Sequence, residues 1–177
     1  MSVPKEFSKL FDSKKVYKQQ YTSALSLPFS QQLPIVGFCA HTEEDVRRLE
    51  SMFEGLQAMK VPLIIFWSGA KKLSLDWYEQ ASVIAPHDAH YESMWRACDT
   101  AYCFTSEDLK TAIASGVVPL APKGLKGADN YDPNKEKGNA FIFDVLNPWV
   151  MFSSLVRALE TYKFPFDWKC IVRNAKR

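Results

Sequence analysis

Several short apolar runs in this sequence are each followed at once by polar side chains or glycine, the residue types that bind anions and small polar ligands. If the runs are parallel strands, these residues meet at one edge of a sheet, because ligands of such sheets bind at the carboxyl ends of the strands. A cation or a glycine-rich loop there can hold a phosphate. The candidate ligand-binding residues are His41, Arg47, Ser68, Gly69, Glu107, Asp108, Lys123, Gly124 and Leu125.

The loop that begins at Lys123 combines lysines with glycines. Such a loop after a parallel strand can cradle an anion, although a solvated surface loop accounts for the same residues equally well. Glu107 and Asp108 also form an ordinary acidic first turn of a helix, and Arg47 falls on the polar side of its helix. Each of these residues therefore has a purely structural interpretation beside the binding one.

Familiar catalytic signatures are missing from the sequence. It contains no Walker loop, no nucleophile-elbow motif and no dinucleotide-binding glycine motif. The segment 87–90 holds two histidines and an aspartate, but without a third convincing ligand nearby it fits a polar turn better than a metal site. The sequence therefore predicts no catalytic residue, no metal site and no cofactor.

Six short apolar runs alternate with stretches of helical periodicity, which indicates a parallel sheet with helices on both faces. The sequence predicts an α/β, doubly wound, Rossmann-like fold of about six strands in a single domain, 1–177, with an N-terminal arm at 1–13 and a C-terminal helix pair at 147–177. The expected strands are 34–40, 61–67, 82–85, 100–104, 117–121 and 140–143, and the expected helices are 42–56, 74–80, 90–97, 107–115, 147–162 and 167–175.

Composition and charge exclude several classes of protein. The 177 residues carry 22 Lys and Arg against 20 Asp and Glu, a net charge of +2, which gives no strong field for nucleic acid or an anionic membrane. The apolar runs are too short for the roughly 20 residues that cross a bilayer, and no secretory signal is visible. Four scattered cysteines without a CxxC pair predict reduced thiols in a cytoplasmic protein.

A series of short segments carries a family likeness through its order and spacing. The segments are Lys18–Pro28, Pro34–Phe38, Ala97–Asp99, Gly116–Pro119, Asp132–Lys135, Gly138–Phe143, Leu155–Tyr162, Trp168 and Arg173–Ala175. Together they resemble the C-terminal domain of bacterial glycogen synthases and plant starch synthases, which are glucosyltransferases of the two-domain GT-B fold. The resemblance implies a domain that binds ADP-glucose or UDP-glucose and works with an acceptor domain to elongate an α-1,4-glucan.

The same resemblance implies that the donor site has changed. His41 stands where the family places an arginine that holds the sugar-nucleotide phosphates, and the acidic segment 42–45 replaces the family's Gln-Lys-Gly. The family's glutamate-bearing loop is shortened around Ser106, and its phosphate-binding loop is reduced to 123–128. Because carboxylates repel a diphosphate, we expect the site to be degenerate.

Two functions fit this pattern. We favour a non-catalytic interaction or regulatory module that is inactive alone; the alternative is the nucleotide-sugar-binding half of a split glucosyltransferase, working with an acceptor-domain polypeptide or as a homo-oligomer. A third interpretation is an unrelated doubly wound protein, such as a flavodoxin-like receiver. Fewer than five parallel strands, or a strand order other than 3-2-1-4-5-6, would contradict the GT-B interpretation. Exposed aromatic side chains near the C-terminus would mark a partner surface, and the candidates are Trp149, Phe164, Phe166 and Trp168.

Overall fold

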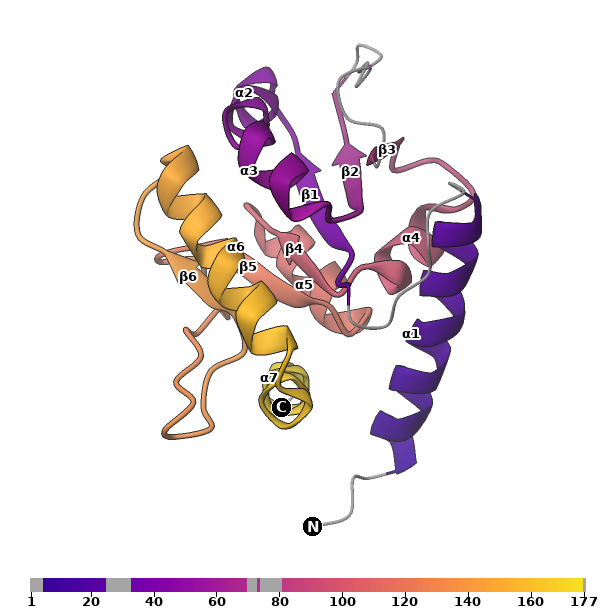
Figure 1. The fold of residues 1–177 in the computed structure, drawn as a ribbon, viewed down its shortest axis with the longest axis vertical. Helices are drawn as coiled ribbons and strands as arrows, with labels where there is room; N and C mark the ends of the chain where they lie inside the picture. Colours follow the sequence, from indigo (N-terminus) through magenta and orange to yellow (C-terminus); the bar gives the residue numbers. More distant parts are fainter. Residues whose placement is uncertain (1–4, 25–32, 70–72, 74–80, 177) are drawn as a thin grey trace.

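A computed structural model describes residues 5–24, 33–69, 73 and 81–176 of the chain, and its side chains from residue 12 onward. Six parallel strands form one sheet in the order β3-β2-β1-β4-β5-β6 (Figure 1). This is the doubly wound order, so the predicted fold class is confirmed. The strands are β1 (Val36–Ala40), β2 (Leu63–Trp67), β3 (Ala81–Ile84), β4 (Thr100–Tyr102), β5 (Val118–Pro122) and β6 (Phe141–Phe143).

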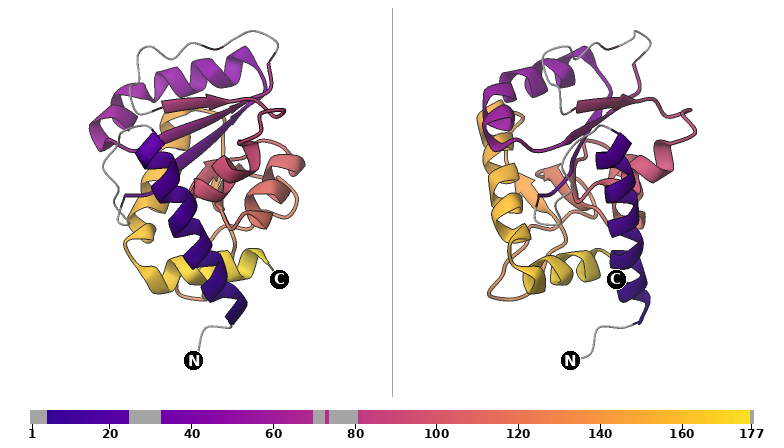
Figure 2. Two further views of the ribbon diagram at one scale, coloured as in Figure 1. Left: turned by 90° about the vertical axis from the view of Figure 1, so that its right-hand side faces the viewer. Right: turned by 45° about the vertical axis from the view of Figure 1, so that its right-hand side comes forward.

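Helices cover both faces of the sheet (Figure 2). The side chains of β1 alternate between the two faces. Val36, Phe38 and Ala40 pack in one core cluster, whereas Cys39 packs in the other. The first cluster includes side chains of α2 (Glu43–Ser51), α3 (Phe53–Met59), α6 (Pro148–Tyr162) and α7 (Pro165–Ala175). The second includes side chains of α1 (Lys5–Ala24), α4 (Tyr91–Ala97) and α5 (Ser106–Ala114).

Two helices differ from the sequence prediction, and a third predicted helix is not described by the structure. The single helix expected at 42–56 is divided at Met52, which ends α2 and precedes α3. Residues 5–13, set apart as an N-terminal arm, form the first part of α1. The helix expected at 74–80 falls outside the described residues. The predicted C-terminal helix pair is present as α6 and α7, with Asn147 capping α6 and a proline at the start of each helix.

Two buried lysines fasten α1 to the rest of the domain. Lys18 lies 2.8 Å from the Asp99 carboxylate, and both side chains are about 95% buried. Asp99 Oδ2 also accepts the Ile35 N–H at 2.8 Å, and the Tyr162 hydroxyl lies 3.1 Å from Lys18 Nζ. Lys14 donates to the carbonyls that end α4, and burial lowers the pKa of its amino group. The helix is therefore held by polar contacts made at the amino-terminal side of β1 and β4.

The four cysteines are buried and none is in a disulfide, which agrees with the predicted thiols. Burial raises the pKa of Cys39 and Cys98. Both thiols therefore behave as small apolar side chains. None of the described helices has the length and apolar character needed to cross a bilayer.

Candidate functional site

The carboxyl ends of β1 and β4 are the point where the strand order of the sheet reverses. These two strands are neighbours, and the chain leaves them in opposite directions, to α2 on one face and to α5 on the other. Ligands of doubly wound sheets bind in the crevice at such a point, commonly with an anionic group against a helix N-terminus. The two helix starts therefore decide what this site can hold.

The N-terminus of α2 is occupied by its own carboxylate. Thr42 and Asp45 form a capping box, in which the Thr42 hydroxyl accepts the Asp45 N–H and Asp45 Oδ2 accepts the Thr42 N–H at 3.0 Å. The same oxygen accepts the N–H of His41 at 3.1 Å. Asp45 thus satisfies, from within the chain, amides that would otherwise face a bound phosphate.

The N-terminus of α5 repeats this arrangement. Thr105 and Asp108 form a second capping box, and Asp108 Oδ2 accepts the N–H groups of Thr105 at 2.9 Å and Phe104 at 3.1 Å. Asp108 is 7% exposed. Its carboxylate therefore takes the second set of amides at the same crevice.

His41 joins the two halves of the site. Its Nε2 lies 2.9 Å from Asp108 Oδ2, and its Nδ1 lies 3.0 Å from the hydroxyl of Ser68, the first residue after β2. Three of the predicted site residues, far apart in the sequence, are therefore brought together. The histidine does not project freely toward a ligand, because both ring nitrogens have partners within the chain.

The cations near the site are paired with carboxylates. Arg47 lies 3.0 Å from Glu44 on the exposed side of α2, and Arg48 lies 2.8 Å from Asp45. Lys123 lies 3.2 Å from Asp144, and both of these side chains are more than 70% exposed. The Arg47–Glu44 and Lys123–Asp144 pairs are exposed and contribute little stability. Arg48 instead neutralises Asp45, the carboxylate that caps α2.

The glycine loop after β5 forms turns on the surface. The Lys123 N–H donates to the carbonyl of Phe143, Gly124 has φ +88°, and nothing lies within 4 Å of the position that a Cβ would take there. Leu125 is half-buried. The loop is open, and the Lys123 side chain pairs with Asp144 rather than with a residue of the group formed by His41.

Two further predicted positions serve the local structure. Glu107 is exposed in the first turn of α5. A Cβ on Gly69 would lie 1.9 Å from the Trp67 ring, so glycine lets the chain cross closely over that indole. The amide-holding role of Asp45 was missed, although its signal was present in the sequence: the spacing Thr-x-x-Asp occurs at 42–45 and again at 105–108.

The aromatic residues proposed as a partner surface do not form one patch. Trp149, Phe164 and Phe166 are 74%, 60% and 64% exposed, but Trp149 lies in the first turn of α6 and the two phenylalanines follow its last turn, roughly 20 Å away along the axis. Trp168 is only 5% exposed. Its ring packs edge-on against Tyr162 of α6, with centroids 4.9 Å apart, so its assignment to an exposed surface is wrong.

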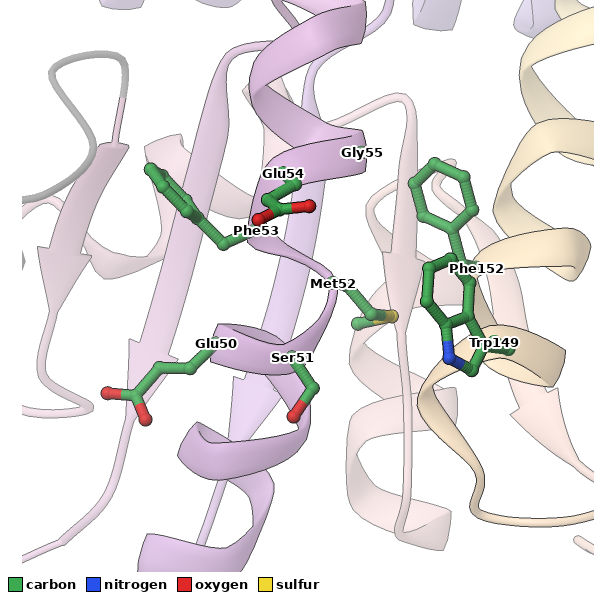
Figure 3. Close-up of a pocket in the computed structure, with 8 residues that line it drawn as sticks. All are labelled: Glu50, Ser51, Met52, Phe53, Glu54, Gly55, Trp149 and Phe152. Carbon is green, nitrogen blue, oxygen red and sulfur yellow. The ribbon is translucent and has the colours of Figure 1, made fainter.

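A hollow of about 350 Å³ lies beside Trp149, between the α2–α3 junction and the start of α6 (Figure 3). Met52 and Phe152 contribute apolar walls, and a Cβ on Gly55 would lie 2.5 Å from the Phe152 ring. The ionisable side chains in its lining are both carboxylates, Glu50 and Glu54. Figure 3 shows the Glu50 carboxylate directed away from Trp149 and Phe152, so the two aromatic rings do not share the hollow with that charge.

The histidine-bearing segment 87–90 is an exposed turn before α4. Asp88 accepts the His90 N–H at 2.8 Å. Within the described part of the chain, no group of three histidine, cysteine or acidic side chains is placed to hold a metal ion. In the structure this segment is therefore a polar turn.

Comparison with known proteins agrees with the resemblance seen in the sequence. No family model matches the chain. It is 33% identical to glycogen synthase 1 of Synechocystis over 69 residues, which are 37% of this chain and 14% of that protein. The catalytic domain of starch synthase IV from Arabidopsis thaliana, bound to ADP and acarbose, superposes with a TM-score of 0.75 at 15% identity, over 92% of this chain and 38% of that one. The chain is thus similar to glycogen and starch synthases and spans well under half the length of either protein.

Proposed function

We propose that this Rossmann-like domain, whose fold matches one part of a starch synthase, is a protein-interaction module that does not transfer glucose by itself. This proposal rests on one observation: Asp45 and Asp108 occupy both helix starts at the crevice. A sugar nucleotide brings a diphosphate, and two like charges 4 Å apart repel by about 1 kcal/mol in water and about 4 kcal/mol at a protein surface. The N–H groups of residues 41, 42, 104 and 105, which would offset part of this repulsion, are already bonded to these carboxylates.

The exposed apolar side chains support the interaction role. Val145, Leu146 and Trp149 are 54%, 47% and 74% exposed in the turn between β6 and α6 and the first turn of that helix. Trp149 also lines the hollow, together with Phe152 and Glu54. We therefore propose that the partner is a protein whose contact surface places a basic side chain among apolar ones, since a cation fits an exposed indole face beside a carboxylate.

The alternative is the donor-binding half of a split glucosyltransferase. The related starch synthase domain is bound to ADP, and the open loop at Lys123 and Gly124 supports an anion contact. In this reading the chain binds ADP-glucose or UDP-glucose, and a separate acceptor-domain polypeptide completes the cleft. The reaction would extend an α-1,4-glucan, with no turnover by this chain alone.

Calorimetry with ADP-glucose, UDP-glucose, ADP and UDP tests the two functions. We expect no binding heat up to about 1 mM ligand, because the carboxylates hold the amides that the diphosphate needs. A Kd below 1 mM, worth about 4 kcal/mol, would contradict the interaction module and support the donor half. In that event Lys123→Ala should weaken binding and Lys163→Ala, an exposed lysine at the end of α6, should not. Incorporation of labelled glucose into glycogen by the isolated chain would contradict both functions.

A further inference from the structure

Ser68, His41 and Asp108 form a continuous hydrogen-bonded chain of a hydroxyl, an imidazole and a carboxylate. The two distances, 3.0 Å and 2.9 Å, are those of direct hydrogen bonds. The carboxylate is 91% buried at its side chain, the imidazole is 35% exposed, and the hydroxyl belongs to an exposed residue. This is the order of accessibility that a nucleophile, its base and an orienting acid require.

The neighbours of Asp108 fix which nitrogen of the neutral imidazole carries the proton. Asp108 Oδ2 already accepts two backbone N–H groups, those of Phe104 and Thr105. An oxygen that accepts both of these groups carries no proton of its own to donate. It therefore accepts from His41 too, so Nε2 carries the hydrogen. The lone pair of Nδ1 then faces the Ser68 hydroxyl and accepts a hydrogen bond from it. The other acceptor near that hydroxyl, the carbonyl of Ala40, is more distant at 3.4 Å.

The backbone after Ser68 adds an N–H group that can stabilise an oxyanion. Ser68 directly follows the carboxyl end of β2, and its own N–H is bonded to the Ala40 carbonyl. The next N–H, that of Gly69, has no acceptor among the described residues. In serine hydrolases the N–H that follows the nucleophile commonly binds the oxyanion. The contact between Gly69 and the Trp67 ring excludes a side chain at this position.

We propose that Ser68 is an acyl-accepting nucleophile toward small uncharged esters, with His41 as its base and Asp108 as the positioning residue. Ser68 Oγ bonds to the carbonyl carbon while its proton passes to His41 Nδ1. The bond to the leaving oxygen breaks, and that oxygen takes the proton and departs as an alcohol. Water then attacks the acyl carbon and gives a proton to Nδ1. The bond between that carbon and Ser68 Oγ breaks, Nδ1 returns the proton to Oγ, and the acyl group leaves as a carboxylic acid.

This activity goes beyond the interaction role and does not depend on it. A neutral ester avoids the repulsion that the acidic residues at the crevice exert on a diphosphate, so both properties can reside in one protein. Nucleotide binding would overturn the interaction module and leave the acyl transfer intact. An unreactive Ser68 would overturn the acyl transfer and leave the interaction module intact.

The test is acetylation by p-nitrophenyl acetate, followed by peptide mapping of the modified residues. In the folded protein we expect Ser68 to be acetylated at least about 100-fold faster than Ser153, an exposed serine of α6 that bonds only its own helix. In urea the two serines should react at the same slow rate. Equal acetylation of Ser68 and Ser153 in the folded protein would overturn the proposal without any variant.

Variants separate the roles of the three residues. Ser68→Ala should abolish the fast release of p-nitrophenol, and His41→Gln should slow the acetylation of Ser68 by about 100-fold or more. Asp108→Asn should slow it as well, because an amide N–H facing the imidazole reverses the tautomer; Asp88→Asn, which alters a similar N–H contact before α4, should leave the rate unchanged. Circular dichroism confirms that each variant is folded. Fast release retained in folded Ser68→Ala would also overturn the proposal.

Discussion

Asp99→Ala is expected to lower the free energy of unfolding by about 3–5 kcal/mol, the range found when one partner of a buried ion pair is removed. Asp99 is 3% exposed and accepts from both Lys18 and the Ile35 backbone at 2.8 Å. Its removal leaves an ammonium group and an amide N–H buried without their acceptor. Both losses fall where α1 joins the sheet, so the helix should detach first.

Urea unfolding followed by circular dichroism measures this effect, and two lysine variants provide a matched comparison. Lys18→Met leaves Asp99 buried and should cost a similar amount. Lys163→Met breaks an ion pair of similar length, 2.7 Å to Glu160, but both of its side chains are about 60% exposed. Its loss of unfolding free energy should therefore stay below about 1 kcal/mol. Equal midpoints for Lys18→Met and Lys163→Met would show that α1 is not held by the buried pair.

Trp168→Ala is the second change with a large expected effect, also about 3–5 kcal/mol, because it empties a large volume in the core. The indole packs against Tyr162 and belongs to the cluster on the face of the sheet that α6 and α7 cover. A cavity there weakens the attachment of α7 to α6.

Trp149→Ala is the matched control, since it removes the same side chain from a position that is 74% exposed. Its change in unfolding free energy should stay within about 0.5 kcal/mol, as for most surface substitutions. The urea midpoints of the two variants, compared at one protein concentration, measure this difference in stability. A Trp149→Ala protein as unstable as Trp168→Ala would mean that the exposed tryptophan is covered within the folded chain.

The strands were predictable because each is a short apolar run with a defined end. The prediction of 61–67 and the observed β2 (Leu63–Trp67) end at the same residue, as do 34–40 and β1 (Val36–Ala40). The starts differ by two residues: residues 34, 35, 61 and 62 are buried but precede the strands, although the carbonyls of Ile35 and Pro62 already accept N–H groups of Thr100 and Val36. Local capping signals are equally clear: Thr42 and Asn147, the first residues of the predicted helices 42–56 and 147–162, cap α2 and α6.

The contacts of the site were not predictable, because they depend on how distant segments meet. Ser68 and Asp108 lie 27 and 67 residues from His41, and local periodicity contains no information on which ring nitrogen faces which partner. Trp168 shows the same limit for the core. It follows two exposed phenylalanines within a few residues, and only the packing of α7 on α6 separates its burial from theirs.

The attachment of α1 also sets an order in which the protein can be completed during synthesis. Lys18 leaves the ribosome 81 residues before Asp99 and 144 residues before Tyr162. At 5–20 residues per second, the helix waits roughly 7–30 s for its last partner. Two of its anchoring groups are ammonium ions, which remain hydrated during this wait, whereas a purely apolar anchor would expose a surface prone to aggregation. The helix α1 is thus made before its partners in this domain and is among the last to be secured, and its lysine anchors suit that delay.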